Sequence, residues 1–260
     1  MIKQLIRRMC HSLGYDIIKY KPPRVEKTVK SDRLSFHKTV TGNYYLPTDA
    51  KADIVANTII ADKIFEEEVV NLASRYIRPG TTVLDVGANF GQMSILFSDM
   101  VGPKGKVHSF DADDWIYEIF NKNIVANNKE NIIIHHFGAV HNIDGEILIF
   151  PEQDFEKFDA YGAFGIDYTA SDGREVKSIT IDSLNISEPI SFMKIDIQGG
   201  DLQAMQGAVN TIVRNKMPIL FEYEYHFEEK YNMKFQNYVD FVLNIGYEFE
   251  KVINGHNYLI

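Results

Sequence analysis

The hydrophobic residues fall into two alternating patterns, short continuous apolar runs and longer stretches with an apolar face at helical spacing. Continuous runs are typical of strands buried on both faces of a sheet. Helices are predicted at Ile54–Arg78, with a break near Asp62, after Gly91, at Trp115–Asn127, after Asp201 and at Phe235–Asn244. Core strands are predicted at Thr82–Val86, Val107–Phe110, Ile132–Phe137, Ser191–Ile197 and Pro218–Tyr223. This alternation predicts an α/β fold with a doubly wound, Rossmann-like sheet.

The end of the chain predicts an antiparallel hairpin. Two apolar segments, Tyr247–Val252 and His256–Leu259, flank Asn254-Gly255, the preferred pair for a two-residue hairpin turn. Two further strands, Glu146–Phe150 and Val176–Ile181, surround a long segment rich in Gly, Asp, Phe and Tyr. Loops of such length are usually functional or disordered. We interpret Pro151–Glu175 as a lid that faces the substrate, with disorder as the alternative.

The N-terminal segment differs from the rest of the chain. Met1–Lys21 has an apolar helical face and adds positive charge to an acidic protein. This predicts an amphipathic helix that contacts a membrane surface or an assembly partner, or one that packs on its own domain. Arg24–Lys51 is predicted to be an irregular linker with one short strand at Asn43–Leu46. We therefore expect a helix and linker over residues 1–52 and one α/β domain over residues 53–260.

Composition narrows the class of protein. The chain has 260 residues, a formal net charge of −9 and one cysteine, Cys10. Such a charge disfavours nucleic acid as a partner, and a single cysteine excludes an internal disulfide. No apolar run reaches transmembrane length, and the first residues lack the apolar core of a signal peptide. We expect a cytoplasmic protein. An alternative is a protein that contacts the inner face of the membrane through residues 1–21. The sequence predicts no oligomeric state.

The first core strand leads into a glycine turn. Thr82–Val86 contains Asp85, and Gly87-Ala88-Asn89-Phe90-Gly91 follows directly before a helix. Glycine permits a sharp turn and close approach of a ligand, and the free amides of the helix start attract an anion. The second core strand ends on Asp111, where a carboxylate can accept hydrogen bonds from the hydroxyls of a ribose. This arrangement predicts a site for a nucleoside cofactor, against the alternative of a plain strand–turn–helix unit.

The glycine spacing distinguishes between cofactors. Asn89 and Gln92 replace the second and third glycines of the dinucleotide fingerprint. An asparagine side chain obstructs the approach of a pyrophosphate, which argues against a nucleotide-dependent oxidoreductase. S-adenosylmethionine (SAM) carries a smaller anion, and Asp85 supplies negative charge for its ammonium and sulfonium groups. Gly87, Asn89 and Gly91 are therefore predicted to bind SAM.

Other candidate residues follow the remaining core strands. The third strand contains His135 and His136. Gly138 and Ala139 follow its carboxyl end, and these two residues are predicted to border the cofactor. Ligands of open α/β sheets bind at this edge. Further acids and a histidine follow the fourth and fifth strands at Asp196, Glu222, Glu224 and His226.

Four motifs in order resemble the FkbM family of class I SAM-dependent methyltransferases. They are T-V-L-D-V-G-A-N-F-G, S-I-T-I-D-S-L, M-K-I-D-I-Q-G-G-D-L-Q-A-M-Q-G-A and P-I-L-F-E-Y, and the resemblance extends from about Asp62 to the C-terminus. It implies a seven-stranded sheet with a C-terminal hairpin, SAM as the methyl donor and O-methylation of a hydroxyl, often on a sugar or a polyketide. The pair Phe65-Glu66 resembles an upstream F/Y-E pair and implies that Glu66 faces the cofactor. The sequence departs from the family at two places. Asp111-Ala112 replaces the usual Glu-Pro pair, and Gly200 replaces the alanine or tyrosine that usually follows Q-G.

The chemistry of methyl transfer to a hydroxyl calls for a general base at the carboxyl edge of the sheet. We expect Asp196 to position the acceptor hydroxyl or a cation, and Glu222 or His226 to take the proton. Asp196, Glu222 and Glu224 with a histidine would also suit a divalent metal, although the spacing demands none. The expected acceptor is a small molecule or a glycan, most simply a sugar. The alternative is a catalytically silent scaffold that docks at a membrane or a glycan-assembly complex.

Overall fold

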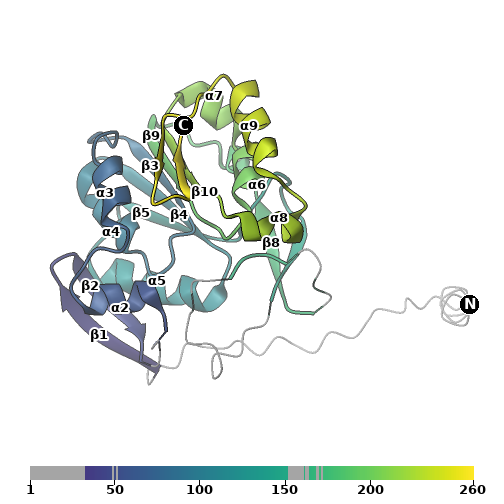
Figure 1. Cartoon of the computed structure of the whole chain (residues 1–260). Helices are drawn as coiled ribbons and strands as arrows, with labels where there is room; N and C mark the ends of the chain where they lie inside the picture. Colours follow the sequence, from purple (N-terminus) through teal and green to yellow (C-terminus); the bar gives the residue numbers. More distant parts are fainter. Residues whose placement is uncertain are drawn as a thin grey trace, which may run out of the picture.

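The computed structural model describes residues 33–48, 50, 52–151, 161, 164–167, 170 and 172–260 (Figure 1). The helix predicted at Met1–Lys21 lies outside the described residues, as does much of the predicted lid. Within the described part of the chain, no helix has the length and apolar character needed to cross a membrane.

A sheet of seven strands, counted within the described residues, forms the centre of the molecule in the order β11-β12-β10-β9-β3-β4-β5. All neighbouring pairs from β10 to β5 are parallel, whereas β12 is antiparallel to both β10 and β11. The predicted fold class and C-terminal hairpin are therefore confirmed. The strands are β3 (Thr82–Val86), β4 (Lys106–Asp111), β5 (Ile133–Phe137), β9 (Ile190–Ile195), β10 (Ile219–Glu222), β11 (Lys251–Ile253) and β12 (Asn257–Leu259).

Helices cover both faces of this sheet, because neighbouring residues of the central strands point to opposite sides. Val83 of β3 belongs to one apolar cluster and Leu84 to the other. The first cluster includes residues of α2 (Ile54–Ile60), α3 (Glu67–Ala73), α4 (Gln92–Val101) and α5 (Asp114–Ala126). The second includes residues of α6 (Asp201–Gln206), α7 (Val209–Asn215) and α9 (Phe235–Asn244), which Figure 1 shows together on one side. The predicted break near Asp62 is confirmed, since α2 ends before it and Asp62 has a φ of 60°.

Two smaller sheets flank the central one. The first consists of β6 (Ala139–Val140), β7 (Ile147–Phe150) and β8 (Arg174–Ile179), in the order β6-β8-β7. The strands β7 and β8 are the pair expected on either side of the lid, and they are antiparallel. Short helical turns complete the fold at η2 (Asp182–Leu184), η3 (Tyr225–Phe227) and α8 (Glu228–Tyr231).

The second small sheet corrects the linker prediction. Residues 34–47 form a hairpin of β1 (Leu34–Thr39) and β2 (Gly42–Pro47), where an irregular segment with one strand at Asn43–Leu46 was predicted. Its partners lie at the C-terminal end of α5. The side-chain oxygens of Asn123 on α5 and of Asn127, the residue after this helix, accept hydrogen bonds from the backbone of Tyr45 and Asn43 at 2.6 and 2.8 Å. The hairpin therefore packs on the α/β domain. The domain division at residue 53 stays a prediction.

Candidate functional site

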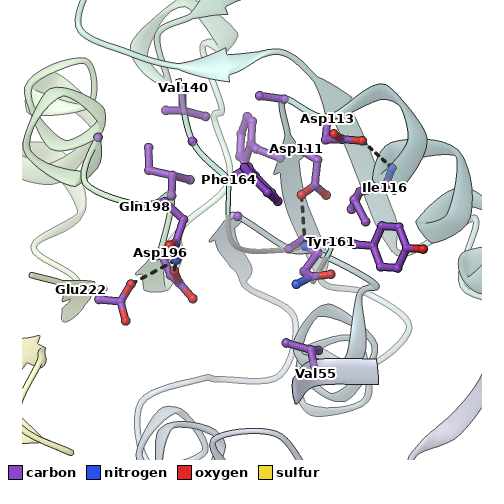
Figure 2. Close-up of a pocket in the computed structure, with 18 of the residues that line it drawn as sticks. Val55, Asp111, Asp113, Ile116, Val140, Tyr161, Phe164, Asp196, Gln198 and Glu222 are labelled. Atoms are coloured by element: carbon purple, nitrogen blue, oxygen red, sulfur yellow. Dashed lines mark hydrogen bonds between the residues drawn. The ribbon is translucent and has the colours of Figure 1, made fainter. Parts of the chain in front are cut away.

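A cavity of about 280 Å³ lies at the carboxyl ends of β3, β4, β9 and β10 (Figure 2). Eleven positions were predicted for this site. Eight of them line the cavity, namely Glu66, Gly87, Asn89, Asp111, Gly138, Ala139, Asp196 and Glu222. Asp85, Gly91 and His226 do not line it. The carboxyl edge of the sheet thus brings most of the predicted residues together.

The glycine turn is set by close packing of the backbone. Gly87 has a φ of 86°, and a Cβ atom there would lie 1.8 Å from the carbonyl oxygen of Asp196. A Cβ at Gly91 would lie 1.9 Å from the ring of Phe120. Both glycines are therefore required by the protein itself, and only Gly87 also borders the cavity. Asn89 has a φ of 55°, and its buried Oδ1 has no hydrogen-bond partner among the described residues.

Asp85 is buried and does not line the cavity. Its carboxylate is fully buried, accepts a hydrogen bond from Ser94 and lies 3.8 Å from the ammonium of Lys194. Lys194 also donates to the carbonyl oxygen of Gly87 at 3.2 Å and contacts Asp196 Oδ2 at 3.3 Å. Burial lowers the pKa of Lys194, but the charges of Asp196 and Asp85 outweigh it and the pKa is raised. Lys194 is thus a buried cation that the sequence analysis missed, although a lone lysine in an apolar strand was a usable signal.

Asp196 and Glu222 form a carboxyl pair bridged by Gln198. The Gln198 amide nitrogen lies 3.3 Å from Asp196 Oδ1 and 3.5 Å from Glu222 Oε2 (Figure 2). Burial raises the pKa of Asp196, but the Lys194 ammonium and its hydrogen-bond partners outweigh this and lower it. Burial and the charges of Asp196 and Asp201 raise the pKa of Glu222 to about 10. At neutral pH the pair therefore holds one proton, on Glu222, and Asp196 is ionised.

Replacing Glu222 by Gln is expected to stabilise the protein at alkaline pH. Folded Glu222 keeps its proton up to a pKa of about 10, whereas the unfolded chain releases it near the ordinary value of 4.5. The free energy of unfolding of the wild type therefore falls between these values as pH rises, by at most about 1.4 kcal/mol per pH unit. Glutamine does not titrate and can still donate to Asp196. In urea unfolding at pH 5.5, 7 and 8.5, the free energy of unfolding of the variant should exceed that of the wild type by an amount that grows with pH.

The matched variant Glu224→Gln controls for the loss of a carboxyl group nearby, because Glu224 does not line the cavity. If the difference in free energy of unfolding between Glu222→Gln and the wild type is the same at all three pH values, the buried, protonated state assigned to Glu222 is contradicted.

The histidine near the carboxyl pair is not the predicted one. His226 lies on η3, its side chain is 53% exposed, and its Nε2 is 3.5 Å from Glu224 Oε2, away from the cavity. His256 occupies the turn between β11 and β12, with Nε2 3.8 Å from Glu66 Oε1 and 3.7 Å from Glu222 Oε1. The signal for His256 was the hairpin itself, since an antiparallel strand beside β10 returns its first residues to the edge where β10 ends.

Glu66 reaches the cavity from the segment before α3. It has the left-handed φ of 47°, and its Oε1 accepts a hydrogen bond from Asn257 at 3.2 Å. Burial raises its pKa. The side chain of Gln92 fixes this segment, because it accepts from the Phe65 amide at 2.9 Å and donates to the Lys63 carbonyl at 2.8 Å. The residue at the third glycine position of the fingerprint therefore positions Glu66.

The divalent-metal site that the sequence allowed but did not demand is not assembled among the described residues. No group of three or more His, Cys, Asp or Glu side chains within the described residues is arranged to hold a metal ion. Glu224, one of the expected ligands, lies beside His226 outside the cavity.

Asp111 stands at the opposite end of the cavity from Asp196. Its Oδ1 accepts a hydrogen bond from the Asn89 amide at 3.1 Å (Figure 2), and its Oδ2 lies 3.0 Å from His135 Nε2. Burial raises the pKa of Asp111 well above its ordinary value, with a further contribution from Asp113. A carboxylate has about four acceptor positions, so these contacts leave about two for a ligand.

Four described residues of the predicted lid line the cavity. Tyr161, Phe164, Gly165 and Ile166 all border it. Asp53 ties this segment to α2, because one carboxylate oxygen accepts from the Ala56 amide and the other from the Tyr161 amide, both at 2.8 Å. The Tyr231 hydroxyl donates to the Ile166 carbonyl at 2.7 Å. These contacts hold the described lid residues over the carboxyl edge of the sheet.

The strand order, with its antiparallel β12 inserted beside β10, and the glycine turn at the carboxyl edge define a class I methyltransferase fold. A sequence model described as "Methyltransferase FkbM domain" matches residues 85–249, more than half of the chain. The chain therefore belongs to the FkbM methyltransferase family, which confirms the resemblance found in the motifs. A model described as "Protein-L-isoaspartate(D-aspartate) O-methyltransferase (PCMT)" matches residues 15–141.

Individual relatives are distant. The chain is 25% identical over 137 residues to a demethylmenaquinone methyltransferase of Symbiobacterium thermophilum. The aligned region covers 53% of the chain and 49% of that protein. The chain thus spans about half the length of this curated relative. Among solved structures, a methyltransferase FkbM from Methylobacillus flagellatus KT matches with 14% sequence identity and a TM-score of 0.45. The match covers 99% of this chain and 69% of that one. Fibrillarin from Aeropyrum pernix, crystallised with S-adenosyl-L-methionine, matches with 11% sequence identity and a TM-score of 0.45. The match covers 90% of this chain and 84% of fibrillarin.

Proposed function

We propose that the protein is a SAM-dependent O-methyltransferase that acts on a hydroxyl of a sugar. The observation that carries the proposal is the shared cavity, which places Asp111 at one end and the ionised Asp196 at the other. The first residue suits the ribose of a nucleoside, and the second suits a proton-releasing hydroxyl.

The residues present fit SAM. Asp111 retains acceptor positions toward the cavity for the ribose hydroxyls, and the buried Oδ1 of Asn89 needs a donor that no described residue supplies. Asp196 and Glu66 surround the cavity with carboxyl groups, which favours a ligand that carries positive charge. When bound, SAM supplies a methyl group activated by a sulfonium centre.

The residues of the chain would handle the proton of the acceptor. Asp196 is ionised and lines the cavity, so it can accept a hydrogen bond from the acceptor hydroxyl and take its proton as the oxygen reacts. Lys194 holds this carboxylate in place. Glu222 carries a proton beside it and lies 3.7 Å from His256, whose side chain is 37% exposed. A proton gained by the pair can therefore leave to solvent through His256.

Support for a sugar acceptor comes from the side chains of the cavity. The rings of Phe150, Tyr161, Phe164 and Tyr231 line it together with the carboxyl groups. Aromatic faces pack against the C–H faces of sugars, and carboxylates accept hydrogen bonds from their hydroxyls. The same carboxyl groups disfavour an acceptor with negative charge near the reacting oxygen.

Calorimetric titration with SAM and with S-adenosylhomocysteine (SAH) tests the cofactor site. We expect micromolar binding of both and no binding of NADH. The acceptor is then sought by mass spectrometry after incubation with SAM and a panel of neutral sugars, amino sugars, a demethylated quinol and an isoaspartyl peptide. A gain of one methyl group on a sugar hydroxyl supports the proposal, whereas methylation only of carbon or carboxylate contradicts it. Absence of SAM and SAH binding would favour the silent scaffold.

A further inference from the structure

A buried histidine stands directly behind Asp111. His135, near the end of β5, has a side chain that is 2% exposed, and its Nε2 lies 3.0 Å from Asp111 Oδ2. Its Nδ1 lies 3.0 Å from the side-chain oxygen Oδ1 of Asn121 on α5. The sequence places this histidine on the third core strand without a role. His135 does not line the cavity.

We propose that His135 is a positioning residue for the nucleoside site: it donates a hydrogen bond from Nε2 to Asp111 and orients that carboxylate toward the ribose hydroxyls. The inference rests on the proposed function, because it assumes that a ribose occupies the cavity. Asn89 and His135 each hold one oxygen of the carboxylate. With both oxygens fixed from the protein side, the remaining acceptor positions face the cavity.

The protonation state of His135 follows from its surroundings. Burial lowers the pKa of His135 to about 3, so the ring is neutral and carries one N–H. When Asp111 is ionised, its carboxylate can only accept, and the hydrogen of the ring then lies on Nε2. Nδ1 then accepts, which requires the Asn121 amide to be flipped so that its nitrogen, in place of Oδ1, faces the ring. The two ends of an amide are nearly equivalent in shape, so this exchange leaves the packing unchanged. Every polar atom of the group is satisfied in this arrangement.

The donor from His135 also bears on the charge of Asp111. Burial raises the pKa of Asp111, and a hydrogen bond to the ionised form opposes that change. The other charged or titratable groups that act on Asp111 and His135 are Asp113, Lys194, Asp85 and His136. Without the Nε2 donor, we expect Asp111 to take up a proton at a higher pH. A protonated Asp111 loses acceptor capacity for the ribose.

A purely structural role for His135 makes different predictions. Its ring packs on Tyr117 and Phe120, with ring centroids 4.2 and 4.4 Å apart. If packing were its only role, replacement by phenylalanine would change stability and leave the recognition of ribose intact. The test therefore measures ribose recognition rather than activity.

The variant His135→Phe keeps an aromatic ring and removes the donor. His136→Phe is its matched control on the same strand, because His136 stacks on Phe110 and His108 and its Nε2 pairs with His108 Nδ1 at 3.0 Å rather than with Asp111. Calorimetry with SAH and with its 2′-deoxy analogue, from pH 6 to 8.5, gives two readouts. In the wild type we expect SAH to bind about tenfold more tightly than the analogue.

In His135→Phe we expect this ratio to fall to about two or three, and the loss of SAH affinity on acidification to begin at a higher pH. His136→Phe should match the wild type in both readouts. His135→Gln, whose amide nitrogen can occupy the position of Nε2, should restore the ratio, and His135→Asn, which reaches only the position of Nδ1, should not. This second pair decides the matter if His135→Phe does not fold.

An unchanged ratio and pH profile in His135→Phe, or equal ratios in the Gln and Asn variants, would overturn the inference. Failure of the wild type to bind SAH would instead overturn the proposed function, so the two failures are distinguishable.

Discussion

Asp196→Asn is expected to lower kcat by about 100- to 10,000-fold, the usual contribution of a general base. Asparagine keeps the shape of the side chain but cannot take a proton. The ionised state of Asp196 depends on Lys194, 3.3 Å away, and on the proton that Glu222 retains. Turnover with the acceptor found by the mass-spectrometric screen measures the effect. SAH affinity, measured by calorimetry on the same variant, should change by less than a factor of about three, since Asp196 lies at the opposite end of the cavity from Asp111.

Asp201→Asn provides the matched control. Asp201 is fully buried, does not line the cavity, and has a pKa raised to about 8 by burial and by the charge of Asp196. It is therefore mostly protonated at pH 7, and asparagine replaces a neutral group of similar size. We expect Asp201→Asn to retain turnover. Full turnover in Asp196→Asn, with normal SAH binding, would remove Asp196 from the role of base.

The fold could be predicted where buried strands and turn residues left local signals. The run at Thr82–Val86 reproduces β3, and Asn254-Gly255 marks the turn between β11 and β12. The hairpin of β1 and β2 left a weaker signal, because two of its amides are bound by the side chains of Asn123 and Asn127, about 80 residues further along the chain. Hydrogen bonds over such separations have no counterpart in local hydrophobic periodicity.

The site could be predicted as far as strand ends define it. Asp111, Asp196 and Glu222 were found because the parallel strands β4, β9 and β10 carry them to one edge. His226 was expected there because it follows Glu222 closely in sequence, but η3 leads the chain away from the cavity. His256 takes the neighbouring position because β12 is antiparallel to β10, with Glu222 opposite Asn257. Only the register of that pairing reveals which histidine faces the carboxyl pair.

Asp111→Ala is expected to weaken the binding of both SAM and SAH at least about tenfold. The ionised carboxylate is predicted to accept charge-assisted hydrogen bonds from the ribose, each on the order of 1.5–3 kcal/mol. Loss of the side chain also removes the acceptor for the Asn89 amide, which contributes to the shape of the glycine turn. Calorimetric titration of the purified variant gives both dissociation constants. The exposed carboxylate of Asp99 on α4 provides a matched control, and Asp99→Ala should bind both ligands as the wild type does.

The same substitution separates binding from folding. Burial raises the pKa of Asp111, which means that the ionised group is held in the folded state at a cost in free energy. Alanine removes this cost, while it leaves the Asn89 amide and His135 without their acceptor. These effects oppose each other, so urea unfolding should show a change in stability that is small beside the loss of affinity. Tight SAH binding by a folded Asp111→Ala protein would show that Asp111 does not bind the ribose. It would also contradict the positioning role of His135.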